Sequence, residues 1–287
     1  MVGARVRRQQ VAFARTRGLS SRRACALLSV ARSSLGYQSR LAIRDAPVLA
    51  DMRALAAQYP RYGYRKIRIF LQRKGHDMSP ERSYRLWRQA GLQVPRRRAR
   101  RRVATSRPRP LPPTAINHVW AYDFIFDTCA DNHSLKCLTV VDEFTHECLA
   151  IDVAGSIRSG RVIEVLTQLV SLHGAPKHLR SDNGPEFIAT AILRWLQTTA
   201  IDTAYIDPGK PWQNGTNESF NGKLRTECLD LEWFRNRIEA KVGIERYRRH
   251  YNEERPHQSL GYLTPAEFKQ QQINSGCLRE GPVEAVL

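Results

Sequence analysis

The first 110 residues of the chain are poor in acidic side chains. They contain 4 Asp and Glu against 28 Lys and Arg, whereas residues 111–287 contain 23 against 18, so the net charge of +19 belongs to the front of the molecule. This asymmetry is typical of a polyanion-binding module joined to a separate functional domain. A membrane surface is the alternative partner, but no basic amphipathic helix with a large apolar face stands out.

Cysteine pairs and long apolar runs are also lacking. The six cysteines form no CxxC pair, and no His/Cys grouping has zinc-finger spacing, so we interpret them as free thiols in a reducing compartment. No apolar run approaches the ~20 residues that span a bilayer, and no secretory signal is evident. These absences favour a cytoplasmic protein, and the length allows a catalytic domain plus small modules.

The basic front is expected to be helical and to contain two modules. In residues 1–45 we predict a helix-turn-helix-like segment whose recognition helix starts within 32–37, with a plain helical hairpin as the alternative. In residues 46–92 we predict a second helical module, which binds DNA and whose third helix is capped by Ser79. The arginines on that helix would face phosphates or solvent; they are Arg82, Arg85 and Arg88.

Residues 93–116 are predicted to be an Arg/Pro-rich linker. Such a composition cannot bury a core, and close to DNA it would follow the phosphates. A solubilising segment is the alternative. The arginines proposed to contact DNA are Arg96, Arg97, Arg98, Arg100, Arg101 and Arg102.

Residues 117–272 have the pattern of an α/β domain, and residues 273–287 form a tail. The pattern predicts the order β-β-β-α-β-α-β-α, in which the first three strands form an antiparallel meander. This order alone fits several α/β folds. The expected strands are 120–127, 135–142, 147–153, 177–181 and 202–206, and the expected helices are 159–173, 185–198 and one carrying Glu218.

Three carboxylates in this domain have contexts that suit metal binding. Asp123 lies in the apolar run 120–126, Asp182 follows a predicted strand, and Glu218, separated from Asp182 by 35 residues, lies near the start of a helix. A carboxylate in an apolar strand is costly unless its charge is compensated. Two divalent cations would compensate it and would support phosphoryl transfer. Asp127 is the alternative to Asp123, because it lies on the same strand face.

Together with two phrases, SDNGPEF at 181–187 and YNEERPHQSL at 251–260, these carboxylates resemble the Asp-Asp-Glu transposases of bacterial insertion sequences. That family belongs to the retroviral integrase-like superfamily, and the likeness is to its downstream-frame (OrfB-type) proteins. The resemblance implies a ribonuclease H-like catalytic core, with a five-stranded mixed sheet flanked by helices. It also implies a basic residue seven places after the glutamate, which is Arg225 here.

The resemblance assigns roles to these residues. Asp123, Asp182 and Glu218 would be catalytic and would hold two Mg²⁺ ions, with Mn²⁺ as a substitute. Arg225, with Lys223 as its rival, would bind terminal phosphates. Lys210 and Trp212 are candidate DNA contacts in a loop, where the indole would stack on a base.

We therefore expect a transposase that binds element ends, cleaves DNA and joins it to a target. A multimeric complex with double-stranded DNA in the bacterial cytoplasm and an upstream-frame (OrfA-type) partner follow from the same resemblance. Two alternatives remain: a nuclease of the same fold that does not join strands, and a non-catalytic DNA-binding regulator.

Overall fold

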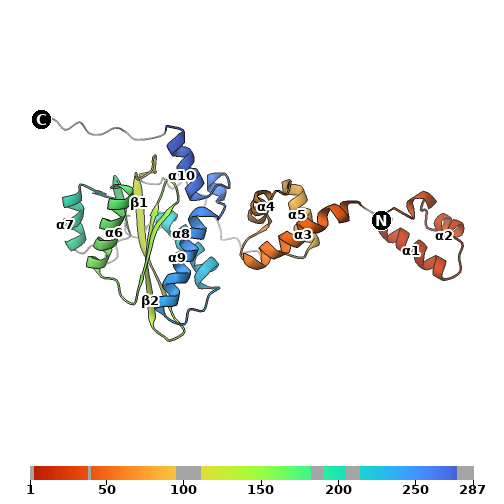
Figure 1. Cartoon of the computed structure of the whole chain (residues 1–287), viewed down its shortest axis with the longest axis horizontal. Helices are drawn as coiled ribbons and strands as arrows, with labels where there is room; N and C mark the ends of the chain where they lie inside the picture. The colour runs from red at the N-terminus through yellow and green to blue at the C-terminus, as the bar shows by residue number, and fades with distance from the viewer. Residues whose placement is uncertain (1–2, 38–39, 95–110, 182–189, 205–213, 277–287) are drawn as a thin grey trace, which may run out of the picture. The chain divides into compact units, whose positions relative to one another are not determined.

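The computed structural model describes residues 3–37, 40–94, 111–181, 190–204 and 214–276. The chain divides into two compact units (Figure 1). The first unit comprises Met1–Gln58 and Leu71–Gln93, and the second comprises Tyr59–Phe70 and Val94–Leu287. The first unit thus ends at Gln93, where the linker was predicted to begin, and residues 59–70 belong to the second unit.

The N-terminal helices of the first unit pack around a small apolar cluster. Helices α1 (Ala4–Thr16) and α2 (Ser21–Leu27) bury Val11, Ala24 and Cys25 between them. Ser20 caps α2 by accepting a hydrogen bond from the backbone of Arg23. The expected recognition helix is reduced to the 3-10 turn η1 (Arg32–Ser34). Serine side chains that bond the local backbone, as Ser34 does to Ala31, compete with helix formation, and Gly36 follows.

Three further helices follow: α3 (Arg40–Gln58), α4 (Tyr64–Arg73) and α5 (Pro80–Gln89). Ser79 caps α5 as predicted, accepting from the backbone of Arg82. Two of the three outward arginines of α5, Arg82 and Arg85, both bind the buried carboxylate of Asp45. Tyr84 of the same helix is exposed.

A five-stranded mixed sheet forms the centre of the second unit. Its strand order is β3-β2-β1-β4-β5. Strand β2 runs antiparallel to β1 and β3, whereas β4 is parallel to both β1 and β5. The predicted sheet is thereby confirmed. The bounds are β1 Val119–Thr128, β2 Ser134–Asp142, β3 Cys148–Ala154, β4 His178–Arg180 and β5 Asp202–Thr203.

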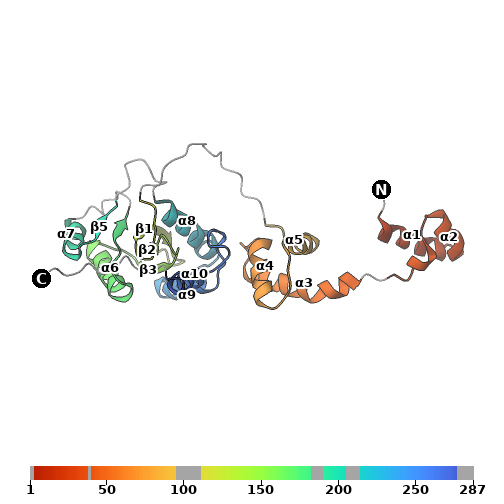
Figure 2. The ribbon, with the colours of Figure 1, turned by 90° about the horizontal axis from the view of Figure 1, so that it is seen from above.

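Helices cover both faces of this sheet (Figure 2). On one face lie α6 (Ser159–His173) and α7 (Thr190–Thr199), and on the other lie α8 (Gly215–Leu224), α9 (Arg237–Glu253) and α10 (Pro265–Asn274). A π-helical turn, η3 (Arg225–Leu229), continues α8, and a short 3-10 turn, η4 (Gln258–Leu260), follows α9.

Side-chain alternation along β1 decides which face each residue serves. Trp120 and Tyr122 belong to the apolar cluster beneath α6 and α7, whereas Ile125 packs with Phe220 of α8. Because successive side chains point to opposite faces of a sheet, Asp123 shares the face of Ile125 and looks toward α8. No helix in the described parts of the chain is long and apolar enough to cross a membrane.

Candidate active site

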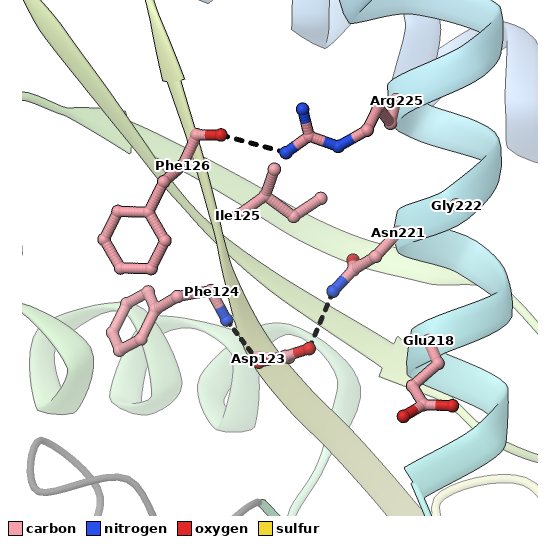
Figure 3. A pocket seen from close by; sticks show the side chains of 8 residues that line it. All are labelled: Asp123, Phe124, Ile125, Phe126, Glu218, Asn221, Gly222 and Arg225. Atoms are coloured by element: carbon pink, nitrogen blue, oxygen red, sulfur yellow. Dashed lines mark hydrogen bonds between the residues drawn. The ribbon is translucent and has the colours of Figure 1, made fainter. Parts of the chain in front are cut away.

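Strand β1 and helix α8 enclose a pocket of about 370 Å³ (Figure 3). Two of the three predicted carboxylates line it, Asp123 from the strand and Glu218 from the helix. Glu218 is exposed and Asp123 is half-buried, so both can reach a ligand from solvent. The other lining residues are Phe124, Ile125, Phe126, Asn221, Gly222 and Arg225.

Hydrogen bonds fix the orientation of Asp123. Its Oδ1 accepts from the backbone N–H of Phe124 at 2.7 Å, and its Oδ2 accepts from Nδ2 of Asn221 at 2.9 Å. Oδ1 of Asn221 in turn accepts from the hydroxyl of Thr139 at 3.0 Å, and Thr139 lies opposite Asp123 in the β1–β2 ladder. Each carboxylate oxygen has two lone-pair sites, so accepting a hydrogen bond is compatible with binding a cation.

Sequence reasoning missed Asn221. It stands three residues after Glu218, and residues three apart lie on the same face of an α-helix. That spacing was the available signal, since the residues three and four places after Glu218, Asn221 and Gly222, both border the pocket. The helix itself begins without a side-chain cap at Asn214, whose buried Oδ1 has no hydrogen-bond partner among the described residues.

Asp182, the third predicted carboxylate, lies outside the described residues, as do Lys210, Trp212 and the six arginines between 96 and 102. Among the described residues no group of three or more potential metal ligands occurs. Asp127, the rival of Asp123, does not line the pocket; its Oδ1 accepts from the backbone of Thr128.

The two candidate phosphate ligands after Glu218 point in different directions. Arg225 borders the pocket, is exposed, and donates from Nη2 to the carbonyl of Phe126 at 2.9 Å (Figure 3). Lys223 does not border the pocket, and its ammonium donates to the hydroxyl of Ser219 at 3.0 Å. Burial, together with the positive charge of Arg255, lowers the pKa of Lys223 to about 8.

A second aspartate in an apolar strand, Asp142, has a structural role. It is buried and accepts from three backbone N–H groups and one hydroxyl, and burial raises its pKa. Close to it in sequence, Glu143 forms a fully buried ion pair with Arg180 of β4, with an Nη1–Oε2 distance of 2.8 Å. This pair ties the segment after β2 to the strand that precedes Asp182.

The site therefore places an orienting amide, two carboxylates and a cation around one solvent-accessible pocket at the centre of a mixed α/β sheet. Hard oxygen donors beside an arginine are typical of metal-assisted phosphoryl-transfer enzymes.

Comparison with known proteins identifies the family. Residues 113–211 and 199–265 match two integrase core domain families, and residues 42–100 match an HTH-like domain. An uncharacterized 31.7 kDa protein of insertion element IS407 from Burkholderia multivorans is 40% identical over 250 residues, which cover 87% of this chain and 90% of that protein. Transposase InsD of insertion element IS2 from Escherichia coli is 26% identical over 248 residues, which cover 81% of each chain.

The HTLV-2 integrase catalytic core domain, solved in complex with magnesium, is similar at 19% identity and a TM-score of 0.41, over 54% of this chain and 97% of that one. The chain belongs to the transposases of bacterial insertion elements, within the retroviral integrase-like superfamily. It is thus an Asp-Asp-Glu-type polynucleotidyl transferase with an HTH-like domain in front of the integrase core.

Proposed function

We propose that this transposase binds the ends of its own insertion element, cleaves them, and joins the resulting 3′ ends to target DNA. The observation that carries the proposal is the meeting of Asp123, Glu218 and Arg225 around one open pocket. Carboxylates and a cation at one site suit a reacting phosphodiester. The carboxylates would bind the metal ions, and the cation would neutralise charge on the phosphate.

Asp182 is proposed as the third carboxylate of this site. The direction of β4 supports the assignment, because Ala121 pairs with Arg180 in parallel register. Asp123 follows Ala121 by two residues, and Asp182 follows Arg180 by two. In parallel strands the chain advances in the same direction on both, so β4 leads toward the position of Asp123.

The residues fit a divalent metal, and we propose two Mg²⁺ ions, with Mn²⁺ able to replace them. Asp123, Asp182 and Glu218 supply hard oxygen ligands, and no thiol or imidazole borders the pocket among the described residues. When bound, the ions activate the attacking oxygen and stabilise the leaving oxygen.

The chain's own residues orient and bind the substrate. Asn221 holds the carboxylate of Asp123 in one rotamer through the bond from its Nδ2. Arg225, already directed across the mouth of the pocket toward Phe126, is placed to bind a phosphate beside the reacting one. The 28 basic residues of the first 110, with the HTH-like domain at 42–100, supply affinity for duplex DNA in the cytoplasm.

A homo-oligomer is proposed as the working form, since two element ends must be handled together. An upstream-frame partner that reads DNA is proposed to complete end recognition. Neither proposal changes the assignment of the catalytic residues.

The test uses duplex DNA carrying the element's ends, the full chain and Mg²⁺. Wild type is expected to give nicked and joined products, and Asp123→Asn to give neither. Asp127→Asn is the matched control, because it removes a charge from the same strand outside the pocket. Nicking by Asp123→Asn at the wild-type rate would contradict the site.

Product type separates the alternatives. Cleaved DNA without joined DNA favours a nuclease. Footprints that are unchanged in Glu218→Gln, with no nicking by wild type under any metal condition, favour a regulator.

A further inference from the structure

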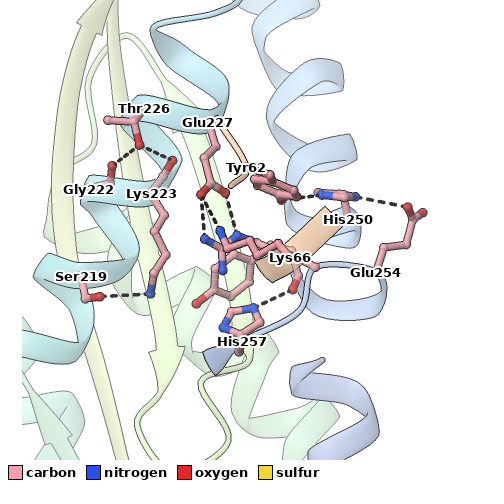
Figure 4. A network of polar contacts seen from close by, with 12 residues as sticks. Tyr62, Lys66, Ser219, Gly222, Lys223, Thr226, Glu227, His250, Glu254 and His257 are labelled. Atoms are coloured by element: carbon pink, nitrogen blue, oxygen red, sulfur yellow. Dashed lines mark hydrogen bonds and ion pairs between the residues drawn. The ribbon is translucent and has the colours of Figure 1, made fainter. Parts of the chain in front are cut away.

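A stretch of the HTH-like region is part of the catalytic unit. Residues 59–70 pack against the helices that follow the sheet, and Tyr62 is buried there (Figure 4). The phenol of Tyr62 lies 2.9 Å from Nε2 of His250 in α9, and the ring of Tyr59 stacks on the imidazole at a centroid distance of 5.0 Å. These contacts hold the first turn of α4 beside α8 and α9.

This packing gathers three cations around a single carboxylate. Glu227, in the π-helical turn after α8, accepts two bonds of 2.6 Å from Arg255 and one of 3.3 Å from Lys66. Lys223 adds a third positive charge, and within the described ranges its ammonium donates to the neutral hydroxyl of Ser219. Among the described residues this cluster therefore carries two more positive charges than negative ones.

The cations of the cluster lower the pKa values of Glu227, Lys66 and Lys223. Burial opposes ionisation of Glu227, but the bonds from Arg255 and Lys66 hold its pKa below the usual value. Burial and the charge of Arg255 lower the pKa of Lys66 to about 8, as they do for Lys223. His257, which also faces the cluster, is kept neutral, since burial and the same cations lower its pKa to about 2.

The cluster faces away from the catalytic pocket. Lys223 follows Glu218 by five residues, which is about 140° around an α-helix. Figure 4 shows Lys223 directed toward Ser219 and the Glu227 side of the helix, whereas Figure 3 shows Glu218 and Arg225 on the pocket side. Lys223 is half-buried, and the side chain of Lys66 retains 24% of its exposure.

We propose that Lys66 and Lys223, backed by Arg255, form a second phosphate-binding site that takes a backbone phosphate of the bound DNA. A phosphodiester supplies the missing negative charge and accepts from ammonium N–H groups that the protein leaves unused. The cluster and the pocket lie on different faces of α8, and a helix with its side chains is about 10 Å across. The contacted phosphate is therefore within a few nucleotides of the reacting one.

This site rests on the proposed function, in that DNA must occupy the pocket. It adds that one DNA strand is held on two faces of α8, by Arg225 on one and by Lys223 on the other. It also assigns to residues 59–70 a direct part in DNA binding at the catalytic unit, through Lys66.

The salt dependence of binding measures such a contact. The affinity of the full chain for a labelled end-carrying duplex is measured between 50 and 200 mM KCl, for wild type, Lys223→Gln and Lys223→Arg. The loss of one phosphate contact lowers the magnitude of the slope of log affinity against log salt by about 0.9. Between 50 and 200 mM KCl, the affinity of Lys223→Gln should therefore fall by a factor that is about 3.5 times smaller than the factor for wild type. Lys223→Arg keeps the charge and is expected to keep the wild-type slope.

Lys241→Gln is the matched control, because Lys241 is exposed on α9 and is not part of the cluster. Urea midpoints of all variants verify folding. Equal slopes for wild type and Lys223→Gln, or the same slope reduction in Lys241→Gln, would overturn the site.

A second measurement locates the phosphate. Single methylphosphonate linkages, which are neutral, are placed in turn along the strand near the cleavage position. At one position the substitution is expected to weaken the wild-type complex but not the Lys223→Gln complex, since the contact is already lost. Additive losses at every position overturn the proposal. The Asp123→Asn nicking assay is independent, so failure of this site and failure of the proposed catalysis give different results.

Discussion

Replacing Asn221 with alanine tests how the pocket is organised. The change removes the 2.9 Å bond from Nδ2 to Oδ2 of Asp123 and leaves Thr139 without its 3.0 Å acceptor at Asn221. A hydrogen bond to a charged group contributes about 1.5–3 kcal/mol. If that energy holds Asp123 in its reactive rotamer, the nicking rate falls about 10- to 150-fold, since about 1.4 kcal/mol corresponds to a factor of ten.

The assay is single-turnover nicking of an end-carrying duplex at saturating protein, with binding measured separately. We expect the rate to fall while the dissociation constant for DNA changes little, because Asn221 borders the pocket without carrying charge. Thr226→Ala is the control in the adjoining turn η3, because the Thr226 hydroxyl donates to the backbone carbonyls of Gly222 and Lys223 and not to a catalytic side chain of the described residues. A nicking rate for Asn221→Ala within twofold of wild type would refute the positioning role.

Three other predictions follow from described contacts. Arg180→Met leaves Glu143 charged and fully buried, so urea denaturation should show a free energy of unfolding lower by about 3–5 kcal/mol. The double variant Arg180→Met/Glu143→Met should regain part of this loss. A loss under about 1 kcal/mol in the single variant would contradict the pairing. The pKa of His257 is far lower in the folded state than in the unfolded state. Its contribution to the free energy of unfolding is therefore complete above about pH 6.5 and falls by about 2 kcal/mol on going to pH 5. His257→Gln should flatten the fall in stability between pH 7 and 5, and an unchanged slope would count against a neutral buried imidazole. Arg225→Gln should lower nicking and reduce the salt slope of DNA binding by about 0.9, whereas an effect on neither would remove Arg225 from the phosphate site.

Much of the second unit was predictable because its sequence signals are local. The helix expected at 159–173 occupies Ser159–His173, and Gly174 follows it with φ of +84°, a conformation that favours glycine. The strand containing Asp123 was recognisable from its apolar run, and the order of strands and helices then restricted the topology. The joint position of Asp123 and Glu218 came from the family resemblance, which no periodicity supplies.

The long-range partners could not be predicted from the sequence. Arg82 and Arg85 stand on a polar helix face, and nothing near them indicates that a buried carboxylate 37 residues upstream of Arg82 takes both. Arg255 likewise pairs with Glu227, 28 residues before it, although acidic residues adjoin it in the sequence. Such pairs are fixed by tertiary packing, because two opposite charges are buried together only where the fold brings them into contact.

The packing of Tyr59–Phe70 against the catalytic helices has a consequence for how these elements can evolve. The HTH-like match at 42–100 contains Tyr62 and Lys66, so its limits do not coincide with the limits of the two structural units. A genetic exchange that replaced this stretch between distant elements would strip α9 of the aromatic cover on His250. A new recognition module must therefore be inherited together with a matching surface of the catalytic unit. Hybrids that exchange the first unit but keep residues 59–70 with their own catalytic unit should be tolerated better than hybrids joined at the linker.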